Sequence, residues 1–447
     1  LFRSRIIFGA DYINEDAGLK QVSSLGGAVT MYLPRDASAM IDFHDVAAIH
    51  GANAVVILRH TDDVSYSIEV YDGRRSVVAV EETGPYLDCP AWSPSGHILY
   101  TRTDSERAVW AQPFDLASMQ ATGDPVLVEN QAWSPSVSAN GDMLLRRGAD
   151  SGGTTIAWAD AAGETRPNDT GFDVVFGPIA SPDGRRVAFA ATNGGERFDI
   201  WVHDTERGLN QRITFVERMI APMFWSPDGR EIVATVFDPV SDPPLETKFF
   251  HTDGSGESRP GLPGMLVSLD EASQTGAVIT GLGASAINAV RIDDPDDAGT
   301  VVVERASGSN PKAAALSPDG SLLAYVSTES GQPQVYCTTF PSGAGKWQVS
   351  TQGGVAVEWA ADGDHLYFQS GGDAPAIYEV AIDREPGLRF SQAALILDGR
   401  AAEVDFDGGW NPPDEHGRIL TTVAKDDNLA PTSLSLIQHW AAMLEQR

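Results

Sequence analysis

Four segments of the chain repeat one short pattern, a tight turn followed by a dense run of apolar residues. They read "SPSGHILY" at 93–100, "SPDGRRVAFA" at 181–190, "SPDGREIVAT" at 226–235 and "SPDGSLLAYV" at 317–326. In such a turn Pro presets φ, Asp hydrogen-bonds the backbone and Gly accepts a positive φ. A dense apolar run is typical of a strand buried on both faces. The pattern therefore predicts a reused β-hairpin, whose Asp and Gly build the turn and are not a catalytic pair.

The turn glycines recur at a regular interval along most of the chain. Neighbouring members of the set lie 43 to 47 residues apart: Gly51, Gly96, Gly141, Gly184, Gly229, Gly276, Gly320 and Gly363. A repeat of about 45 residues is the length of one four-stranded propeller blade. Within 175–216, short apolar or alternating segments are separated by loops, as four strands require. We therefore predict an all-β fold, a β-propeller of four-stranded blades.

The number of repeats bears on the domain organisation. Eight turn glycines in register, with incomplete repeats at both ends, compare with about four to eight blades in one ring. Two arrangements stay open, two propellers or one large ring, and we favour two. Residues 1–130 would then be blades of a first propeller that is incomplete at its N-terminus, and residues 131–447 a second propeller. The apolar stripe of the last segment predicts a short C-terminal helix at 434–446.

The charge of the chain limits the classes of partner. Its 447 residues include 62 Asp and Glu against 31 Lys and Arg, a formal net charge of −31. Such a charge repels nucleic-acid phosphates and anionic lipid head groups. The longest uncharged run, 272–290, is too polar for a membrane span. We therefore expect no nucleic-acid partner and no membrane insertion within this chain.

Common motifs of catalysis and cofactor binding are missing from the sequence. It has no GxSxG nucleophile turn, no HExxH zinc motif, no Walker A loop and no HRD kinase motif. Cys89 and Cys337 are too few for a zinc or iron–sulfur site, and we interpret them as free thiols rather than a disulfide. The acidic segments 293–299 and 372–375 lack the ligand spacing of a calcium loop. We expect no catalytic, cofactor-binding or metal-binding residues, although convergence of histidines from separate blades stays open.

Four tryptophans occupy similar places in their repeats. Trp92, Trp133, Trp225 and Trp359 each precede or enter a turn on the segment expected to form the inner strand of a blade. Either they line a ligand channel, or they pack between neighbouring blades. Large aromatic side chains contribute most when they are buried, so we favour packing.

Several longer segments, in their order along the chain, resemble a known family. Residues 109–128, 180–215 and 317–368, with the terminal "LSLIQHW" at 434–440, are similar to the TolB-type, WD40-like β-propeller repeat family. In particular, they resemble the C-terminal propeller region of bacterial serine/threonine protein kinases. The resemblance covers nearly the whole chain and implies two TolB-like propellers. It also implies a non-catalytic binding or sensing module, in a periplasmic or extracytoplasmic location, and carries over no catalytic residue.

Three functional hypotheses fit these observations. The first, which we favour, is a protein-binding or sensory module of a signalling protein such as a serine/threonine kinase, with a protein or peptide ligand, or a small molecule, at the propeller channel. The second is a periplasmic TolB-like scaffold. The third is a propeller-type hydrolase or lyase, or the accessory domain of a peptidase, and the missing nucleophile and metal motifs disfavour it. Because the chain opens with Leu1 and not Met, we expect further sequence upstream.

Overall fold

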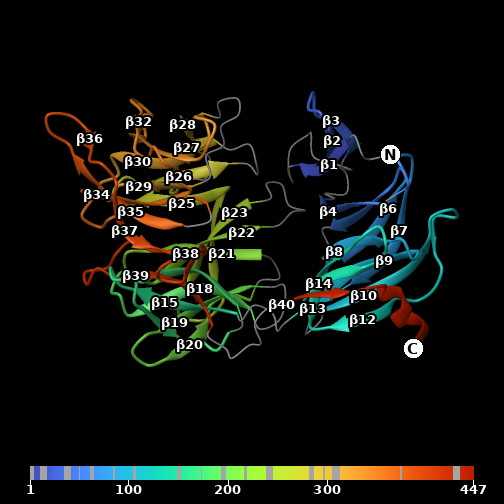
Figure 1. Ribbon diagram of the computed structural model, residues 1–447. Coiled ribbons are helices and arrows are strands. Elements are labelled where there is room, and N and C mark those ends of the chain that lie inside the picture. Colours follow the sequence, from blue (N-terminus) through green and yellow to red (C-terminus); the bar gives the residue numbers. More distant parts are fainter. Residues whose placement is uncertain are drawn as a thin grey trace. The chain divides into compact units, whose positions relative to one another are not determined.

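The computed structural model describes residues 5–10, 18–34, 42–49, 51–60, 65–83, 86–103, 107–147, 153–172, 174–192, 198–215, 219–237, 245–280, 286–294, 297, 299–304, 313–372, 375–425 and 433–446. The chain divides into two compact units, which are described separately. Unit 1 comprises residues 1–152 and 426–447, and unit 2 comprises residues 153–425. Nearly all regular structure consists of β-strands paired in antiparallel sheets (Figure 1).

The strands follow from residue type and periodicity. The run "RVAFAAT", Arg186–Thr192, is buried at six successive positions after the first, as expected for a strand covered on both faces. The third strand of the same sheet, Asp199–Asp204, mixes buried and partly exposed positions. Beyond it, Leu209–Arg212 is exposed at all four positions. Burial thus decreases from the second strand to the fourth, as in a blade whose outer edge faces solvent.

Unit 1 holds four sheets over its described residues. Sheet by sheet, the strands are β1 (Arg5–Ala10), β2 (Gly18–Ser23) and β3 (Thr30–Pro34); β4 (Asp42–Ala48), β5 (Val55–His60), β6 (Ser65–Tyr71) and β7 (Ser76–Thr83); β8 (Tyr86–Ser93), β9 (His97–Thr103), β10 (Arg107–Asp115), β11 (Gln120–Ala121) and β12 (Val126–Asn130); and β13 (Ala132–Val137), β14 (Met143–Arg147) and β40 (Ser433–Ile437). A 3-10 helix, η2 (Trp440–Gln446), follows β40.

Unit 2 holds six sheets over its described residues. Sheet by sheet, the strands are β15 (Thr154–Ala159), β16 (Thr165–Asn168), β38 (Val404–Trp410) and β39 (Ile419–Ala424); β17 (Val174–Ala180), β18 (Arg186–Thr192), β19 (Asp199–Asp204) and β20 (Leu209–Arg212); β21 (Met219–Trp225), β22 (Glu231–Phe237), β23 (Leu245–His251) and β24 (Ser258–Pro263); β25 (Met265–Asp270), β26 (Thr275–Thr280), β27 (Ala286–Arg291) and β28 (Thr300–Val303); β29 (Ala314–Leu316), β30 (Leu322–Ser327), β31 (Gln334–Thr339) and β32 (Trp347–Gln348); and β33 (Ala356–Trp359), β34 (His365–Gln369), β35 (Ala376–Asp383), β36 (Arg389–Phe390) and β37 (Ala394–Asp398).

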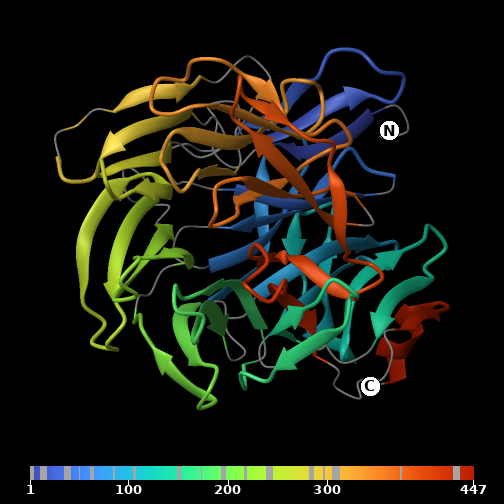
Figure 2. The same cartoon turned by 90° about the vertical axis from the view of Figure 1, so that its left-hand side faces the viewer.

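The sheets of unit 2 close into a ring. Six apolar clusters each join one sheet to the next, and the sixth joins the β33–β37 sheet to the sheet of β15, β16, β38 and β39. Figure 2 shows these sheets following one another in sequence colour around a common centre. The first strands of neighbouring sheets contact one another, so they lie nearest that centre. The predicted β-propeller with four-stranded blades is therefore confirmed.

Closure depends on one sheet built from both ends of unit 2. Its order is β16-β15-β39-β38, and β15 pairs with β39 from Thr154↔Ala424 to Ala159↔Ile419. Asn411, directly after β38, bonds the neighbouring sheet. Its Oδ1 accepts from the Ala180 amide at 2.8 Å, and its Nδ2 donates to the Pro178 carbonyl at 2.9 Å. The two ends of unit 2 are thus held in one hydrogen-bonded sheet and tied to the next.

The sheets of unit 1 form an open series over the described residues. Three apolar clusters join its four sheets in order, and none joins the β1–β3 sheet to the sheet of β13, β14 and β40. The division of the chain falls after residue 152, whereas the sequence prediction placed a boundary between residues 130 and 131. It also places residues 426–447 with unit 1, whereas the prediction kept them with the second propeller.

The predicted helix at 434–446 is corrected by the structure. Ser433–Ile437 is a strand, because β14 offers it an open edge with the register Met143↔Ile437 to Arg147↔Ser433. Only Trp440–Gln446 coils, and it does so as a 3-10 helix. The apolar residues of this segment therefore do not form one helical stripe. Trp440 is fully buried, while Leu436 is 63% exposed.

Candidate functional site

The repeated turn uses its polar residues for its own structure. In all three SPDG copies the Ser hydroxyl donates to the Asp carboxylate, at 2.6 to 2.7 Å, and accepts the amide five residues further on. The three glycines have φ of 67 to 68°, which favours Gly. The hydrogen bond from the Ser hydroxyl lowers the pKa of Asp183 and Asp228. These carboxylates therefore stay ionised at neutral pH, and the turn prediction is confirmed.

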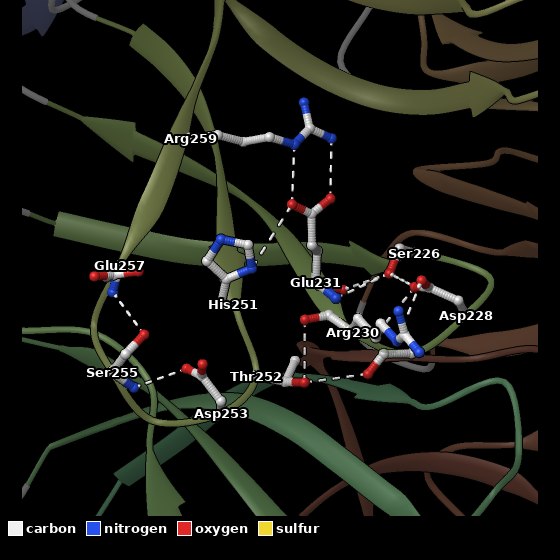
Figure 3. Close-up of polar contacts among 11 residues, drawn as sticks. Ser226, Asp228, Arg230, Glu231, His251, Thr252, Asp253, Ser255, Glu257 and Arg259 are labelled. Atoms are coloured by element: carbon white, nitrogen blue, oxygen red, sulfur yellow. Dashed lines mark hydrogen bonds and ion pairs between the residues drawn. The ribbon is translucent and has the colours of Figure 1, made fainter.

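Figure 3 shows how one of these turns continues into a surface network on the β21–β24 sheet. Arg259 binds Glu231 with two bonds, Nε to Oε1 at 2.9 Å and Nη2 to Oε2 at 3.0 Å. The Arg259 guanidinium also lies 3.5 Å from the centre of the Phe249 ring. His251 Nδ1 lies 4.0 Å from Glu231 Oε1, and Thr252 Oγ1 donates to the Arg230 carbonyl at 3.1 Å. The Glu231 carboxylate finds its partners, Arg259 and His251, within its own sheet. The network therefore stabilises the surface of the blade, and the Glu231 carboxylate is not free to act as a base.

The first strands carry a recurring irregularity in their pairing. In seven sheets the register of the first strand shifts once against the second strand, which leaves one or more residues without a partner in the ladder. In β21, for example, Met223 is skipped between Pro222 and Phe224. Bulges of this kind bend a strand and redirect a side chain.

In unit 1 these irregularities bring polar side chains together. Asp45 and Cys89 are skipped residues of β4 and β8 with φ of 22° and 50°, and Ser134 of β13 has φ of 52°. The Cys89 amide donates to Asp88 Oδ1 at 2.8 Å and to Asp45 Oδ2 at 3.1 Å, and Cys89 Sγ lies 3.4 Å from Ser134 Oγ. The sequence did not predict this cluster, because bulge positions on separate blades carry no common motif.

The Asp45, Asp88 and Cys89 cluster has the ligand types of a metal site but not an activated nucleophile. One potential ligand atom from each residue lies within 4.8 Å of the others, and among the described residues no other group of at least three His, Cys, Asp or Glu side chains does so. Burial raises the pKa of the Cys89 thiol to about 11, and burial with the hydrogen bond to Asp45 raises the pKa of Asp88. The thiol is therefore protonated at neutral pH. Histidines from separate blades do not come together in a group of this kind among the described residues.

A second unusual carboxylate, Glu358, lies on the first strand of the β33–β37 sheet in unit 2. Counted from the turn, Glu358 occupies the position of Ile179, Phe224 and Ala315 in other sheets, two residues before the turn residue whose amide and carbonyl close the hairpin. Those three side chains pack against the next sheet. Glu358 is exposed to solvent, yet protein surrounds it near the ring centre, and this desolvation raises the pKa of its carboxyl to about 7.

The tryptophans singled out in the sequence serve packing. Trp92, Trp133, Trp225 and Trp359 are 6–8% exposed. The indole N–H groups of Trp225 and Trp359 donate to the carbonyls of Ile179 and Ala315 in the preceding sheets, each at 3.0 Å. The prediction that they pack between blades is confirmed.

The two cysteines are free thiols, as expected. Cys337 is buried, which raises the pKa of its thiol to about 12, so it is protonated at neutral pH. Of the two acidic segments, residues 295, 296, 298, 373 and 374 lie outside the described residues. Asp297 accepts the amides of Arg291 and Gly299, so it braces its own loop. The described part of the chain contains no helix with the length and hydrophobicity that a membrane crossing requires.

Comparison with known proteins gives one match in sequence among curated proteins. The chain is 32% identical over 84 residues to the uncharacterized peptidase YuxL of Bacillus subtilis. The match covers 19% of this chain and 11% of the peptidase, so the chain spans about a tenth of that relative's length. No protein-family model matches the chain.

Solved structures with a similar arrangement include TolB proteins. A protein from Agrobacterium tumefaciens assigned as a TolB is 15% identical, with a TM-score of 0.44, over 60% of this chain and 97% of its own. TolB from Acinetobacter baumannii is 12% identical, with a TM-score of 0.25, over 96% and 82%. Prolyl oligopeptidase B from Galerina marginata is 10% identical, with a TM-score of 0.38, over 75% and 55%. No functional conclusion rests on likenesses at this level.

Proposed function

We propose that this chain is a non-catalytic β-propeller module that binds a protein or peptide partner, and that it serves as the sensor region of a bacterial signalling protein such as a serine/threonine kinase. The main observation in favour of a non-catalytic role is that the polar residues of the repeated turn are engaged within the turn itself. The Ser and Asp side chains of the SPDG turns bond each other and their own backbone, so they are not free for a reaction. The kinase association is supported by the resemblance of the sequence.

The closed ring of unit 2 supports a binding role. Its sheets are joined by six apolar clusters, and a rigid scaffold lowers the entropy that is lost when a partner binds. The first strands of this ring keep partly exposed apolar residues, including Met223 and Val267, whereas the second strands are buried almost throughout. Partner contacts at the ring centre are therefore possible without unfolding a blade.

Photo-crosslinking in the native host tests the binding role. A photo-reactive amino acid replaces Met223, at the ring centre, or Leu209, which is 64% exposed on the outer strand β20. We expect a discrete protein adduct from position 223 and none from position 209. Equal adducts from both positions, or none from position 223, would contradict the proposed binding at the ring centre.

A second candidate is an accessory propeller of a peptidase, and the 84-residue match to YuxL favours it. The gene sequence upstream and downstream of this chain separates the candidates. A kinase domain followed by about twenty apolar residues supports the sensor role, and an adjacent α/β-hydrolase domain supports the peptidase role. Purified chain should leave fluorogenic peptides uncleaved and resist fluorophosphonate labelling. Labelling of a serine would contradict the non-catalytic proposal.

A further inference from the structure

The charge pattern of the first strands in unit 2 is one-sided. β17, β21, β25, β29, β33 and β38 contain no Lys, Arg or His over their described lengths, and their charged residues are Asp270, Glu358, Asp405 and Asp407. Contacts between neighbouring sheets place these strands nearest the ring centre. Asp270 accepts hydrogen bonds from the Ala272 amide and the Ser273 hydroxyl in its own turn. First strands without a basic residue favour a positively charged ligand group at the ring centre.

Glu358 differs from its counterparts in three other sheets. At its position Ile179, Phe224 and Ala315 pack against the next sheet, and an apolar side chain there contributes to the junction. Its neighbours on the same face, Ala356 and Ala360, do pack against the next cluster. Among the described residues the Glu358 side chain has no hydrogen-bond or ion-pair partner. A carboxylate that desolvation disfavours and no residue compensates is costly to keep.

The junction beside Glu358 is also built differently from its counterparts. Trp225 and Trp359 donate to backbone carbonyls of the preceding sheets, but Trp410 donates to the Gln369 side chain, at 3.0 Å. The first strand of that next sheet, β38, is skipped from 406 to 409 in its pairing with β39. At this junction a side-chain acceptor therefore takes the place of the backbone carbonyl, and Glu358 is exposed to solvent.

We infer that Glu358 is the recognition carboxylate for a cationic side chain of the bound partner, the guanidinium of an arginine or the ammonium of a lysine, which enters at the centre of unit 2. The inference rests on the proposed binding function and adds the chemistry of the ligand. A guanidinium supplies the charge and hydrogen-bond donors that Glu358 lacks. The partner contributes a basic residue to a ring centre whose first strands carry no Lys, Arg or His over their described lengths, in keeping with the net charge of −31 of the whole chain.

The experiment is an NMR pH titration of full chain labelled with 13C at the glutamate side-chain carboxyl, with Glu358→Gln used to assign the resonance. The probe is Nα-acetylarginine amide, and the matched neutral control is Nα-acetylcitrulline amide. At ten times its Kd, the arginine probe should shift the proton equilibrium of Glu358 about elevenfold, which lowers the titration midpoint by about one pH unit. The citrulline probe should leave the midpoint unchanged.

Two controls keep the inference open to contradiction. Glu164 is an exposed glutamate beside a turn of unit 2. The substitution Glu164→Gln should leave the shift of the Glu358 titration midpoint as it is in the unaltered chain. An unchanged Glu358 midpoint at saturating arginine probe overturns the inference, as does an equal shift with the citrulline probe. A larger shift with calcium chloride at equal ionic strength also overturns it, in favour of an inorganic cation. Because the titration contains no protein partner, its failure does not affect the photo-crosslinking test of the binding function.

Discussion

Unit 1 and unit 2 use the same repeat but complete it differently. In unit 2 the last sheet takes strands from both ends of the unit, and six apolar clusters run around the ring. In unit 1 the final sheet also takes a strand from the C-terminal segment, β40, but three clusters join four sheets and the described series stays open. Pairing of strands that are distant in the sequence is therefore enough to complete a sheet. Closure of the ring also requires that the last sheet pack against the first.

The end of the open series in unit 1 carries exposed apolar residues. In unit 1, Leu144 is 41% exposed, and Leu434 and Leu436 are 71% and 63% exposed. Leu144 and Leu436 lie opposite each other in the β14–β40 ladder, so they share one face of the end sheet. In unit 2 each sheet takes part in two clusters. Its exposed apolar residues include Leu209, Val301 and Leu395, which lie on outer strands.

The largest expected effect comes from Trp440→Ala in unit 1. Trp440 is fully buried in the cluster that joins the last two sheets, and its indole N–H donates to Ser93 Oγ at 3.0 Å. Removing a buried Trp side chain costs about 3–5 kcal/mol. Hydrogen exchange should show faster opening of β13, β14 and β40, with unit 2 unchanged. The control Leu434→Ala, at an exposed position, should change little, and equal effects of the two variants would break the comparison.

Ring closure in unit 2 is tested by Asn411→Ala. The substitution removes two hydrogen bonds to the neighbouring sheet and leaves the Ala180 amide and the Pro178 carbonyl without those partners. An unsatisfied, partly buried polar group costs about 1–3 kcal/mol. We expect faster hydrogen exchange in β17 and β38. Asn140→Ala, in an exposed turn of unit 1, is the control. Loss of protection spread evenly over both units would argue against a local closing role for Asn411.

Substitutions at two turn glycines distinguish the cost of backbone strain from the cost of a steric clash between sheets. An added Cβ at Gly184 meets nothing within 4 Å, whereas at Gly320 it lies 2.7 Å from the Asp270 carboxyl in the neighbouring sheet. Both have nearly the same positive φ, so Gly184→Ala should cost about 1–2 kcal/mol through strain alone. Gly320→Ala should cost more, because Asp270 must move. Urea unfolding of the two variants measures the difference, and equal losses would mean that the sheets are not packed tightly at this turn.

The smallest expected effect is the acid sensitivity of the turn carboxylates. Burial opposes ionisation of Asp319, but hydrogen bonds from Ser317 and Ser321 and the nearby Arg384 lower its pKa to about 2. A lowered folded-state pKa adds stability that is present above the unfolded value near 3.8 and is lost as the pH falls toward 2. Because Asp319 is half exposed, we expect about 0.5 kcal/mol or less. Asp319→Asn should reduce the difference in unfolding free energy between pH 5 and pH 2. An unchanged difference would contradict this assignment.

Glu358 should act in the opposite direction. Its folded-state pKa of about 7 lies above the ordinary glutamate value of 4.5, so the folded state holds the proton more tightly. The protein should therefore lose stability as the pH rises from about 4.5 to 7, and Glu358→Leu should remove that loss. Thermal unfolding at pH 4.5 and pH 8 measures it. A variant that is less stable than the unaltered chain at pH 8 would show that the carboxylate has a partner in the folded protein.

The repeat determined the class of fold from sequence alone. Glycines at regular intervals, each in a turn before a dense apolar run, specify hairpins, and the period specifies how many strands lie between them. Local residue types suffice for this, because turn conformation and strand burial depend on neighbouring residues. The packing role of the tryptophans and the free state of the cysteines could also be predicted from the sequence, since both follow from residue type.

Only the tertiary structure decided which strands share a sheet and which side chains meet. β40 is a strand because β14 leaves an edge for it, a fact that no local pattern in residues 433–437 contains. Asp45, Asp88 and Cys89 come together through bulges in two separate sheets. Nothing in the sequence distinguishes Glu358 from other glutamates. Its special place is seen only when the register shows that it occupies the position of Ile179, Phe224 and Ala315 in other sheets. Such features depend on contacts between residues far apart in the chain, and those contacts are set by how the sheets pack.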